Sequence, residues 1–187
     1  MMESSKHAIT KEEAVDILDR TIGFVQNCDN KTSILLAVFA GLFTIVFSTE
    51  CPSIIQEITI ESLKLNSVMH FIFFILGLLS VLFIMVGIIT LIFVLIPKVE
   101  GKDIKGLEFE QKSKIFFGGI VMFESYDKYK DSLLHMTEEE YMNHIVSQIY
   151  INSIICSKKY RKYTIGMRCS LVGFALFFIC LTFGLFI

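Results

Sequence analysis

The sequence CDNKTSILLAVFAGLFTIVFS occupies residues 28–48, and the change within it from charged to apolar residues determines the fold. The charged residues Asp29 and Lys31 are followed, from Thr32 to Ser48, by 17 residues without a charge. A helix of that length is at the lower limit of what crosses a hydrocarbon core of about 30 Å. The stretch therefore predicts a membrane-spanning helix that begins directly after a charged boundary.

The rest of the chain repeats this pattern of long apolar runs. Hydrophobic residues make up 53% of the 187 residues, charged residues only 19%, and the mean hydropathy is +0.63. Further runs cover residues 69–96, which Pro97 ends, and residues 165–187. Because such runs are typical of membrane spans, we predict an all-α membrane protein with three transmembrane helices at 32–48, 69–96 and 165–187.

Basic residues are distributed unevenly between the segments outside these runs. Residues 1–31 hold four Lys and Arg, residues 49–68 hold one, and residues 97–164 hold eleven. Because basic residues remain on the cytoplasmic side, we predict a cytoplasmic N-terminal helix at 1–31, a short external loop at 49–68 and a cytoplasmic segment at 97–164. The net charge of −2 argues against nucleic acid as a partner.

Two capping boxes begin the amphipathic helices of the cytoplasmic part. Thr10 is followed at i+3 by Glu13, and Thr137 by Glu140, which satisfies free amides at a helix start. Apolar residues then recur at spacings of three and four and predict one buried face per helix. The first face comprises Val15, Leu18, Ile22, Val25, Asp29, Thr32 and Leu36, and the second comprises Tyr141, Ile145, Gln148, Asn152, Ile155 and Lys159. Since neither Pro nor Gly interrupts the first face at the membrane boundary, we predict a helix that continues into the first span and a mostly helical cytoplasmic stalk.

The middle of the chain contains nine apolar residues, from Ile115 to Phe123. Nine residues of helix span only about 13 Å, which is too little to cross a bilayer. The segment is β-branched and aromatic with Gly118 and Gly119 inside it, so we predict a short irregular or β segment. Residues 124–135 follow as a predicted helix.

Asp29 lies on the buried face of the first helix at the membrane edge. An unpaired carboxylate on a packing face costs several kcal/mol, and Lys31 points to a different face. Lys159 occupies the matching position on the other helix, so we predict that Asp29 and Lys159 pair and hold a resting state. The alternative is that the polar residues at this membrane edge are solvated and unpaired, and that Lys31 extends to lipid head groups.

Two amides, Gln148 and Asn152, share the buried face of the second helix at the spacing i, i+4. Polar residues on such a buried face either fix the register of the packed helices or contact a ligand. The sequence leaves both possibilities open.

The sequence contains none of the common motifs of catalysis or metal binding. Its five cysteines are odd in number and form no CxxC pair, which argues against a disulfide framework or zinc site. Glu140 and His144 are spaced i, i+4 on one helix, and we interpret them as an exposed pair. We therefore predict no enzymatic activity, no cofactor and no metal.

The spans are almost free of ionisable residues, which argues against a transporter with a charged midplane site. Arg168 is close enough to the end of the third span to extend to the membrane surface. Small residues at helix-packing spacing, Ala37 with Gly41 and Gly166 with Ser170, permit close helix contact within or between chains.

Three stretches, in this order, resemble the membrane-spanning effectors of Pycsar, a bacterial anti-phage system that signals with cyclic pyrimidine mononucleotides. They are Asp29-x-Lys31-Thr32-Ser33, Phe116-Phe117-Gly118, and Gln148-Ile149-Tyr150-Ile151-Asn152-Ser153-x-Ile155 leading to Lys159-Tyr160. The layout of the spans is similar to that family over nearly the whole chain. Thr32, where alanine is more usual, and Gly119 depart from the pattern.

The resemblance implies a multi-pass protein of the bacterial inner membrane that is silent until infection triggers a uridylate or cytidylate cyclase. Cyclic UMP or cyclic CMP would then activate it to impair the inner membrane, and the cell would die or stop growing before phage matures. A second class of function stays open, a constitutive membrane scaffold or assembly subunit that recruits a cytoplasmic partner through its stalk.

A receptor for a cyclic mononucleotide needs cationic or amide groups for the phosphate and a polar, partly aromatic slot for the base. The cytoplasmic side offers few such groups. We predict that the ligand contacts Lys31, Phe117, Gly118, Gln148, Asn152 and Lys159. Because one pair of helices is too thin to enclose a nucleotide, we expect a homo-oligomer in the lipid bilayer with the site between subunits.

Overall fold

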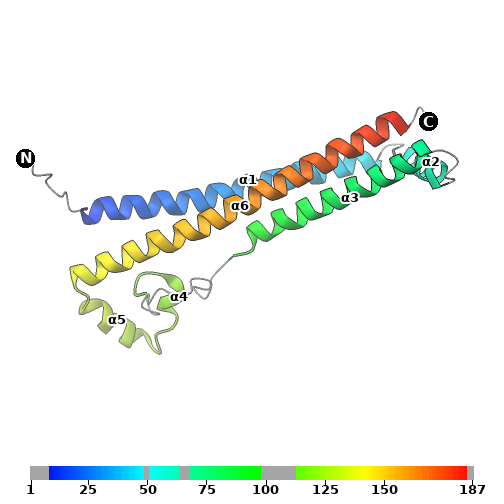
Figure 1. Cartoon of the computed structure of the whole chain (residues 1–187). Helices are drawn as coiled ribbons and strands as arrows, with labels where there is room; N and C mark the ends of the chain where they lie inside the picture. Colours follow the sequence, from blue (N-terminus) through cyan, green and yellow to red (C-terminus); the bar gives the residue numbers. More distant parts are fainter. Residues whose placement is uncertain (1–8, 49–50, 64–67, 98–112, 185–187) are drawn as a thin grey trace, which may run out of the picture. The chain divides into compact units, whose positions relative to one another are not determined.

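The computed structural model describes residues 9–48, 51–63, 68–97 and 113–184, and Figure 1 shows their helices. In chain order the elements are α1 (Lys11–Ser48), α2 (Cys51–Leu63), α3 (Val68–Leu95), α4 (Phe117–Ile120), α5 (Tyr126–Leu134) and α6 (Glu138–Gly184). By length and composition α1, α3 and α6 can each cross a membrane, and the described residues contain no strand. The predicted all-α membrane protein with three spans is therefore confirmed.

Both long helices begin at the predicted capping boxes. The Glu13 amide donates to Thr10 Oγ1 at 3.2 Å, and the Thr10 amide donates to Glu13 Oε2 at 2.8 Å. Thr137 and Glu140 exchange the same two bonds, both at 3.2 Å. From these starts α1 runs for 38 residues and α6 for 47 residues. The prediction of one continuous helix from the stalk into the first apolar run is confirmed.

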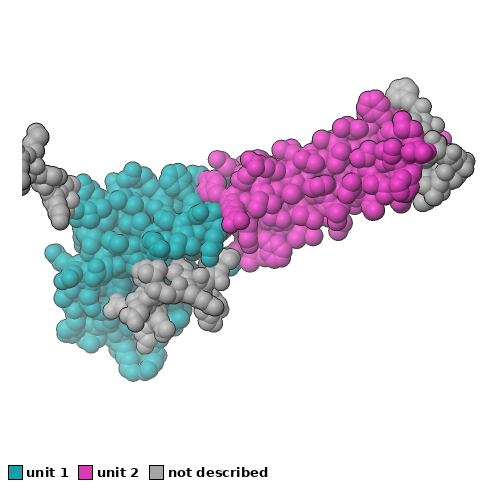
Figure 2. All heavy atoms as spheres, viewed as in Figure 1, with its two compact units in different colours: residues 1–27, 97–158 teal, residues 28–96, 159–187 magenta. Residues whose placement is uncertain are grey.

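The chain divides into two compact units, which Figure 2 shows in different colours. Unit 1 comprises Met1–Asn27 and Pro97–Lys158, and unit 2 comprises Cys28–Ile96 and Lys159–Ile187. α1 and α6 contribute residues to both units, whereas α3 belongs to unit 2 alone. Unit 2 therefore contains the apolar part of all three spanning helices and is called the membrane bundle below.

The membrane bundle places α1 parallel to α6. Asp29 contacts Lys159, and further along both helices the Phe39 and Phe174 rings lie with their centroids 5.0 Å apart. A hydrophobic core of Phe39, Ile84, Leu91 and Phe174 joins these helices to α3. Only 17% to 28% of each apolar window is buried, so most apolar side chains of the bundle face outward, as contact with lipid requires.

Glycines bring the backbones of α3 and α6 into close contact. A Cβ atom at Gly87 would lie 2.2 Å from Ser170 Oγ, and one at Gly173 would lie 2.7 Å from the Ile84 backbone nitrogen. Earlier residues of α3 therefore lie against later residues of α6, which makes the two helices antiparallel. Close approach of this kind strengthens packing in lipid, where the hydrophobic effect does not drive helices together.

The two predicted pairs of small residues have different environments. Gly166 and Ser170 lie in the α3–α6 contact, and both are buried. Ala37 and Gly41 lie on an exposed face of α1, where a Cβ atom at Gly41 would meet no described atom within 4 Å. The first pair thus packs within the chain.

The segment at 49–68, predicted to be a short external loop, contains the helix α2 from Cys51 to Leu63. Pro52 stands in its first turn, where a missing backbone N–H does no harm. α2 packs against α3. The connection between the first two spans is thus a packed helix for most of its length.

Unit 1 is held together by contacts of Lys114. Its Nζ donates to the Ser132 carbonyl oxygen at 3.4 Å and lies 3.5 Å from Glu140 Oε1. Its carbonyl oxygen accepts a hydrogen bond from Tyr129 Oη at 3.2 Å. These bonds connect the residues that precede α4 with α5 and with the first turn of α6.

The apolar segment at 115–123 contains the single helical turn α4 and otherwise irregular structure. The β alternative is therefore wrong for this part, while residues 98–112 lie outside the described residues. The helix predicted at 124–135 is confirmed as α5, and its cap Ser125 accepts a bond from the Lys128 amide at 3.3 Å.

Candidate functional site

Asp29 and Lys159 meet in the membrane bundle. Lys159 Nζ donates to both carboxylate oxygens of Asp29, at 2.5 and 2.7 Å. The Lys159 side chain is 10% exposed and the Asp29 side chain 35%. The bond is charge-assisted and partly withdrawn from water, so it is stronger than a fully exposed ion pair. The predicted contact is present, and its role as a switch stays a prediction.

The residues around Asp29 follow the helical period. Thr32 is buried and donates its hydroxyl to the Cys28 carbonyl oxygen at 2.7 Å, which satisfies it within the helix. Cys28 is buried as well, although the pattern of apolar residues had not identified it. Lys31 is exposed and lies on another face of α1, as its spacing from Asp29 predicts.

Gln148 is buried in unit 1 and carries an unpaired amide oxygen. The residue is 5% exposed, and its Oε1 has no hydrogen-bond partner among the described residues. Asn152, one turn further on, donates from Nδ2 to the Gln148 carbonyl oxygen at 2.8 Å. A buried acceptor left without a donor costs about 1–3 kcal/mol. Gln148 therefore presents an acceptor that a bound donor would satisfy.

His144 is buried on the same side of α6, which corrects the interpretation of His144 and Glu140 as an exposed pair. Residues spaced i, i+4 share a helix face, so His144 and Gln148 lie on one face. Ile145 and Ala14 of α1 are buried in the same unit. Glu140 instead accepts a bond from the Thr137 amide. The interior of unit 1 thus contains both apolar and polar side chains.

Phe117 presents an exposed aromatic ring in unit 1. The residue is 58% exposed, and its ring centroid lies 4.5 Å from that of Phe116. A Cβ atom at Gly119 would lie 2.2 Å from the Ser113 carbonyl oxygen, so this glycine allows the chain to fold closely on itself. Its neighbour Gly118 is half-buried.

The six predicted ligand contacts fall into two groups. Phe117, Gly118, Gln148 and Asn152 belong to unit 1, and Lys31 and Lys159 belong to unit 2. Within unit 1 the structure brings Gln148 and Asn152 into direct contact. Within unit 2 Lys159 is engaged by Asp29, and Lys31 is not part of that contact.

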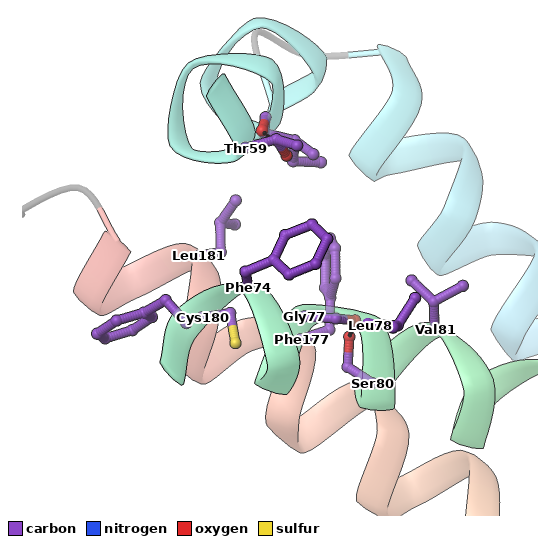
Figure 3. Close-up of a pocket in the computed structure, with 11 residues that line it drawn as sticks. Thr59, Phe74, Gly77, Leu78, Ser80, Val81, Phe177, Cys180 and Leu181 are labelled. Atoms are coloured by element: carbon purple, nitrogen blue, oxygen red, sulfur yellow. Dashed lines mark hydrogen bonds between the residues drawn. The ribbon is translucent and has the colours of Figure 1, made fainter. Parts of the chain in front are cut away.

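A cavity of about 220 Å³ lies in the membrane bundle between α2, α3 and α6. Figure 3 shows Phe74 and Leu181 extending toward α2, on which Thr59 lies. The hydroxyl groups of Thr59 and Ser80 line it, but they donate to the carbonyl oxygens of Ile55 and Gly77. The remaining lining is apolar, so the cavity does not suit a charged nucleotide.

No three His, Cys, Asp or Glu side chains gather as a metal site in the part of the chain that the structure describes. Cys28, Cys156, Cys169 and Cys180 are free thiols.

The fold and these groups define a helical membrane protein with three spans and a second unit containing buried polar side chains. A family model described as the Pycsar effector protein domain, PycTM, matches residues 13–186. The chain therefore belongs to the Pycsar effector family, whose members are anti-phage membrane effectors.

One curated relative supports this assignment. The Pycsar effector protein GmPycTM of Gulbenkiania mobilis is 29% identical to this chain over 177 residues, which cover 84% of each protein. No solved structure matches the chain.

Proposed function

We propose that this chain binds cyclic UMP or cyclic CMP through unit 1 and then impairs the integrity of the bacterial inner membrane. Membership of the Pycsar effector family supports the link to cyclic nucleotide signalling. The observation that carries the proposal is the buried, unpaired Oε1 of Gln148. The nucleotide would come from a uridylate or cytidylate cyclase, and cell death or arrest would stop phage multiplication.

The chemistry of a pyrimidine base fits a buried amide. Uracil presents an N–H donor between two carbonyl acceptors, and cytosine presents an amino donor beside a ring acceptor. A glutamine side chain offers one acceptor and two donors, so Gln148 can bond to either base edge. Stacking on an exposed aromatic ring adds about 1–3 kcal/mol per base, and Phe117 offers such a ring in the same unit.

Activation requires two states that the ligand distinguishes. In the resting state of this proposal, the Asp29–Lys159 bond holds α1 against α6 in the membrane bundle. A ligand that binds the active state a hundredfold more tightly shifts the equilibrium by about 2.7 kcal/mol. A shift of that size exceeds the strength of exposed ion pairs and is comparable to the cost of breaking a partly buried one.

We also propose that copies of this chain associate with one another in the membrane. The face of α1 that carries Ala37 and Gly41 is exposed in the single chain and would allow a second chain to approach closely. Chemical crosslinking in membranes, with and without nucleotide, tests it. A protein that crosslinks only to monomer under both conditions would contradict this part of the proposal.

Purified protein in liposomes tests the nucleotide response directly. We expect cyclic UMP or cyclic CMP, and not cyclic AMP, to dissipate a potassium gradient reported by a voltage-sensitive dye. Calorimetry on the same protein measures binding. A constitutive scaffold would show neither nucleotide-dependent leakage nor binding.

Gln148→Met tests the residue that carries the proposal. Methionine keeps the volume of glutamine and removes its amide, so stability should be unchanged or higher while nucleotide binding falls at least roughly tenfold. Asn143→Ala, which removes an exposed amide from the same helix, is the matched control. If Gln148→Met binds nucleotide like the parent protein, Gln148 only fills the interior and the site lies elsewhere.

A further inference from the structure

Arg168 lies on the outward face of α6, among exposed apolar side chains. It is exposed, and so are Ile165 and Val172, which lie about one turn before and after it on the same face. Gly166 and Ser170, on the opposite side of the helix, make the contact with α3. Charged side chains in a membrane usually face the bundle interior or pair with an opposite charge. An outward Arg168 therefore needs a partner outside the chain.

The spanning helices supply no carboxylate for Arg168. Their parts within the membrane bundle contain five basic residues, and Asp29 is their single acid. Both oxygens of Asp29 already bind Lys159. Neither Arg161 nor Arg168 forms an ion pair with any acid among the described residues. This end of the bundle thus carries uncompensated positive charge.

Arg161 is exposed on the same face of α6, seven residues or about 10.5 Å before Arg168. The neighbouring Lys162 indicates its depth, because Lys162 Nζ lies 5.7 Å from the ring of Phe93, close to the end of α3 at Leu95. Arg161 is therefore level with the end of a spanning helix, where lipid head groups begin. Side chains on a helix point toward its N-terminus, so Arg168 extends back toward Arg161.

We propose that Arg161 and Arg168 together bind the phosphate of an anionic phospholipid, whose acyl chains lie along Ile165 and Val172. Each guanidinium group presents a planar fork that binds phosphate through two parallel hydrogen bonds. The uncompensated positive charge favours an anionic over a zwitterionic head group. The site belongs to the membrane bundle and does not depend on the proposed nucleotide binding in unit 1. Through this site, the lipid composition of the membrane acts directly on α6, the helix that also contributes residues to unit 1.

Lipid retention by the full-length protein tests the proposal. The protein is equilibrated in detergent with equal amounts of phosphatidylglycerol and phosphatidylcholine, and native mass spectrometry counts the retained lipids. We expect the parent protein to prefer phosphatidylglycerol. The double variant Arg161→Gln/Arg168→Gln should retain roughly tenfold less of it, the effect expected from losing charge-assisted hydrogen bonds.

Two further variants separate a built site from general attraction. Arg20→Gln removes an exposed guanidinium group from unit 1, outside the membrane bundle, and should leave retention at the parent level. Arg168→Lys keeps the charge but loses the fork, and should give intermediate retention. Thermal unfolding in phosphatidylcholine alone checks that each variant is folded, and Arg168→Gln alone replaces the double variant if that one unfolds.

Several outcomes would overturn the proposal. Equal retention of phosphatidylglycerol by the parent and the double variant would show that the two arginines bind no lipid. An equal loss from Arg20→Gln would reduce the effect to general electrostatic attraction. Displacement of the lipid by inorganic phosphate or cyclic UMP would assign the arginines to a soluble phosphate. An arginine-dependent dimer in phosphatidylcholine alone would assign them to a second copy of the chain.

Discussion

The bond between Asp29 and Lys159 balances the cost of desolvation against attraction between opposite charges. Lys159 is nearly buried, whereas Asp29 keeps 35% of its side chain exposed. Partial exposure screens the attraction, but removing either partner leaves the other charge near the membrane boundary without compensation. We expect the loss of one partner to cost on the order of 1–3 kcal/mol.

Charge exchange isolates this bond from other effects of substitution. Asp29→Lys and Lys159→Asp should each lower the unfolding temperature in detergent and lower the nucleotide concentration needed for leakage. The double variant restores opposite charges and should recover most of both changes, because interacting residues give non-additive effects. Lys130→Asp, at an exposed position of unit 1, is the control for net charge. Absence of recovery in the double variant would show that the pair does not hold the resting state.

Contacts between residues were predictable where both residues lie on the predicted buried faces of the helices. Asp29 and Lys159 each continue the period of apolar residues, so the pattern alone placed them on facing sides. The burial of His144 was predictable as well, because His144 precedes Gln148 on the predicted buried face by four residues. Its spacing from Glu140 led instead to the interpretation as an exposed pair. The unpaired oxygen of Gln148 depends on all surrounding groups, which one sequence does not specify.

At the scale of elements, hydropathy predicted α1, α3 and α6, and capping boxes predicted the starts of α1 and α6. Long apolar runs and Thr-x-x-Glu motifs are local signals, and both appear unchanged in the structure. α2 was missed because its 13 residues mix isoleucines with Gln56 and Glu57, which is neither a span nor a clear amphipathic stripe. The α3–α6 contact was predicted only in part. The spacing of Gly166 and Ser170 indicated close packing on α6, but it did not identify Gly87 of α3 as the residue in contact.

Two glycines of α3 provide a matched test of this contact. A Cβ atom at Gly87 would lie 2.2 Å from Ser170 Oγ and 2.6 Å from the Ser170 backbone nitrogen, so even alanine must push the helices apart. Gly77, on the same helix, has no described atom within 4 Å of such a Cβ. We expect Gly87→Ala to destabilise the bundle by about 1–3 kcal/mol. Gly77→Ala should be neutral or slightly stabilising. Equal thermal unfolding of the two variants would show that α3 and α6 do not pack closely.

At the scale of the whole molecule, membership of the Pycsar effector family accounts for the combination of spans and a polar unit. Neither the family nor the fold fixes the direction in which the helices cross the membrane. That direction matters, because the proposed nucleotide site in unit 1 must face the cytoplasm, where a cyclase would release its product. Charge is the property of the sequence that bears on it.

We expect the N-terminus and residues 97–164 in the cytoplasm and residues 49–68 outside. The Lys and Arg counts of four, one and eleven in residues 1–31, 49–68 and 97–164 give a strong bias, and basic residues near the ends of spans are retained on the cytoplasmic side. Alkaline phosphatase, which is active only outside, should be active when fused after Lys64 and inactive after Lys130. Green fluorescent protein at the same points should give the opposite pattern. Equal activity at both points would contradict the predicted topology. Phosphatase activity after Lys130 would place unit 1 outside and remove the basis for cytoplasmic nucleotide sensing.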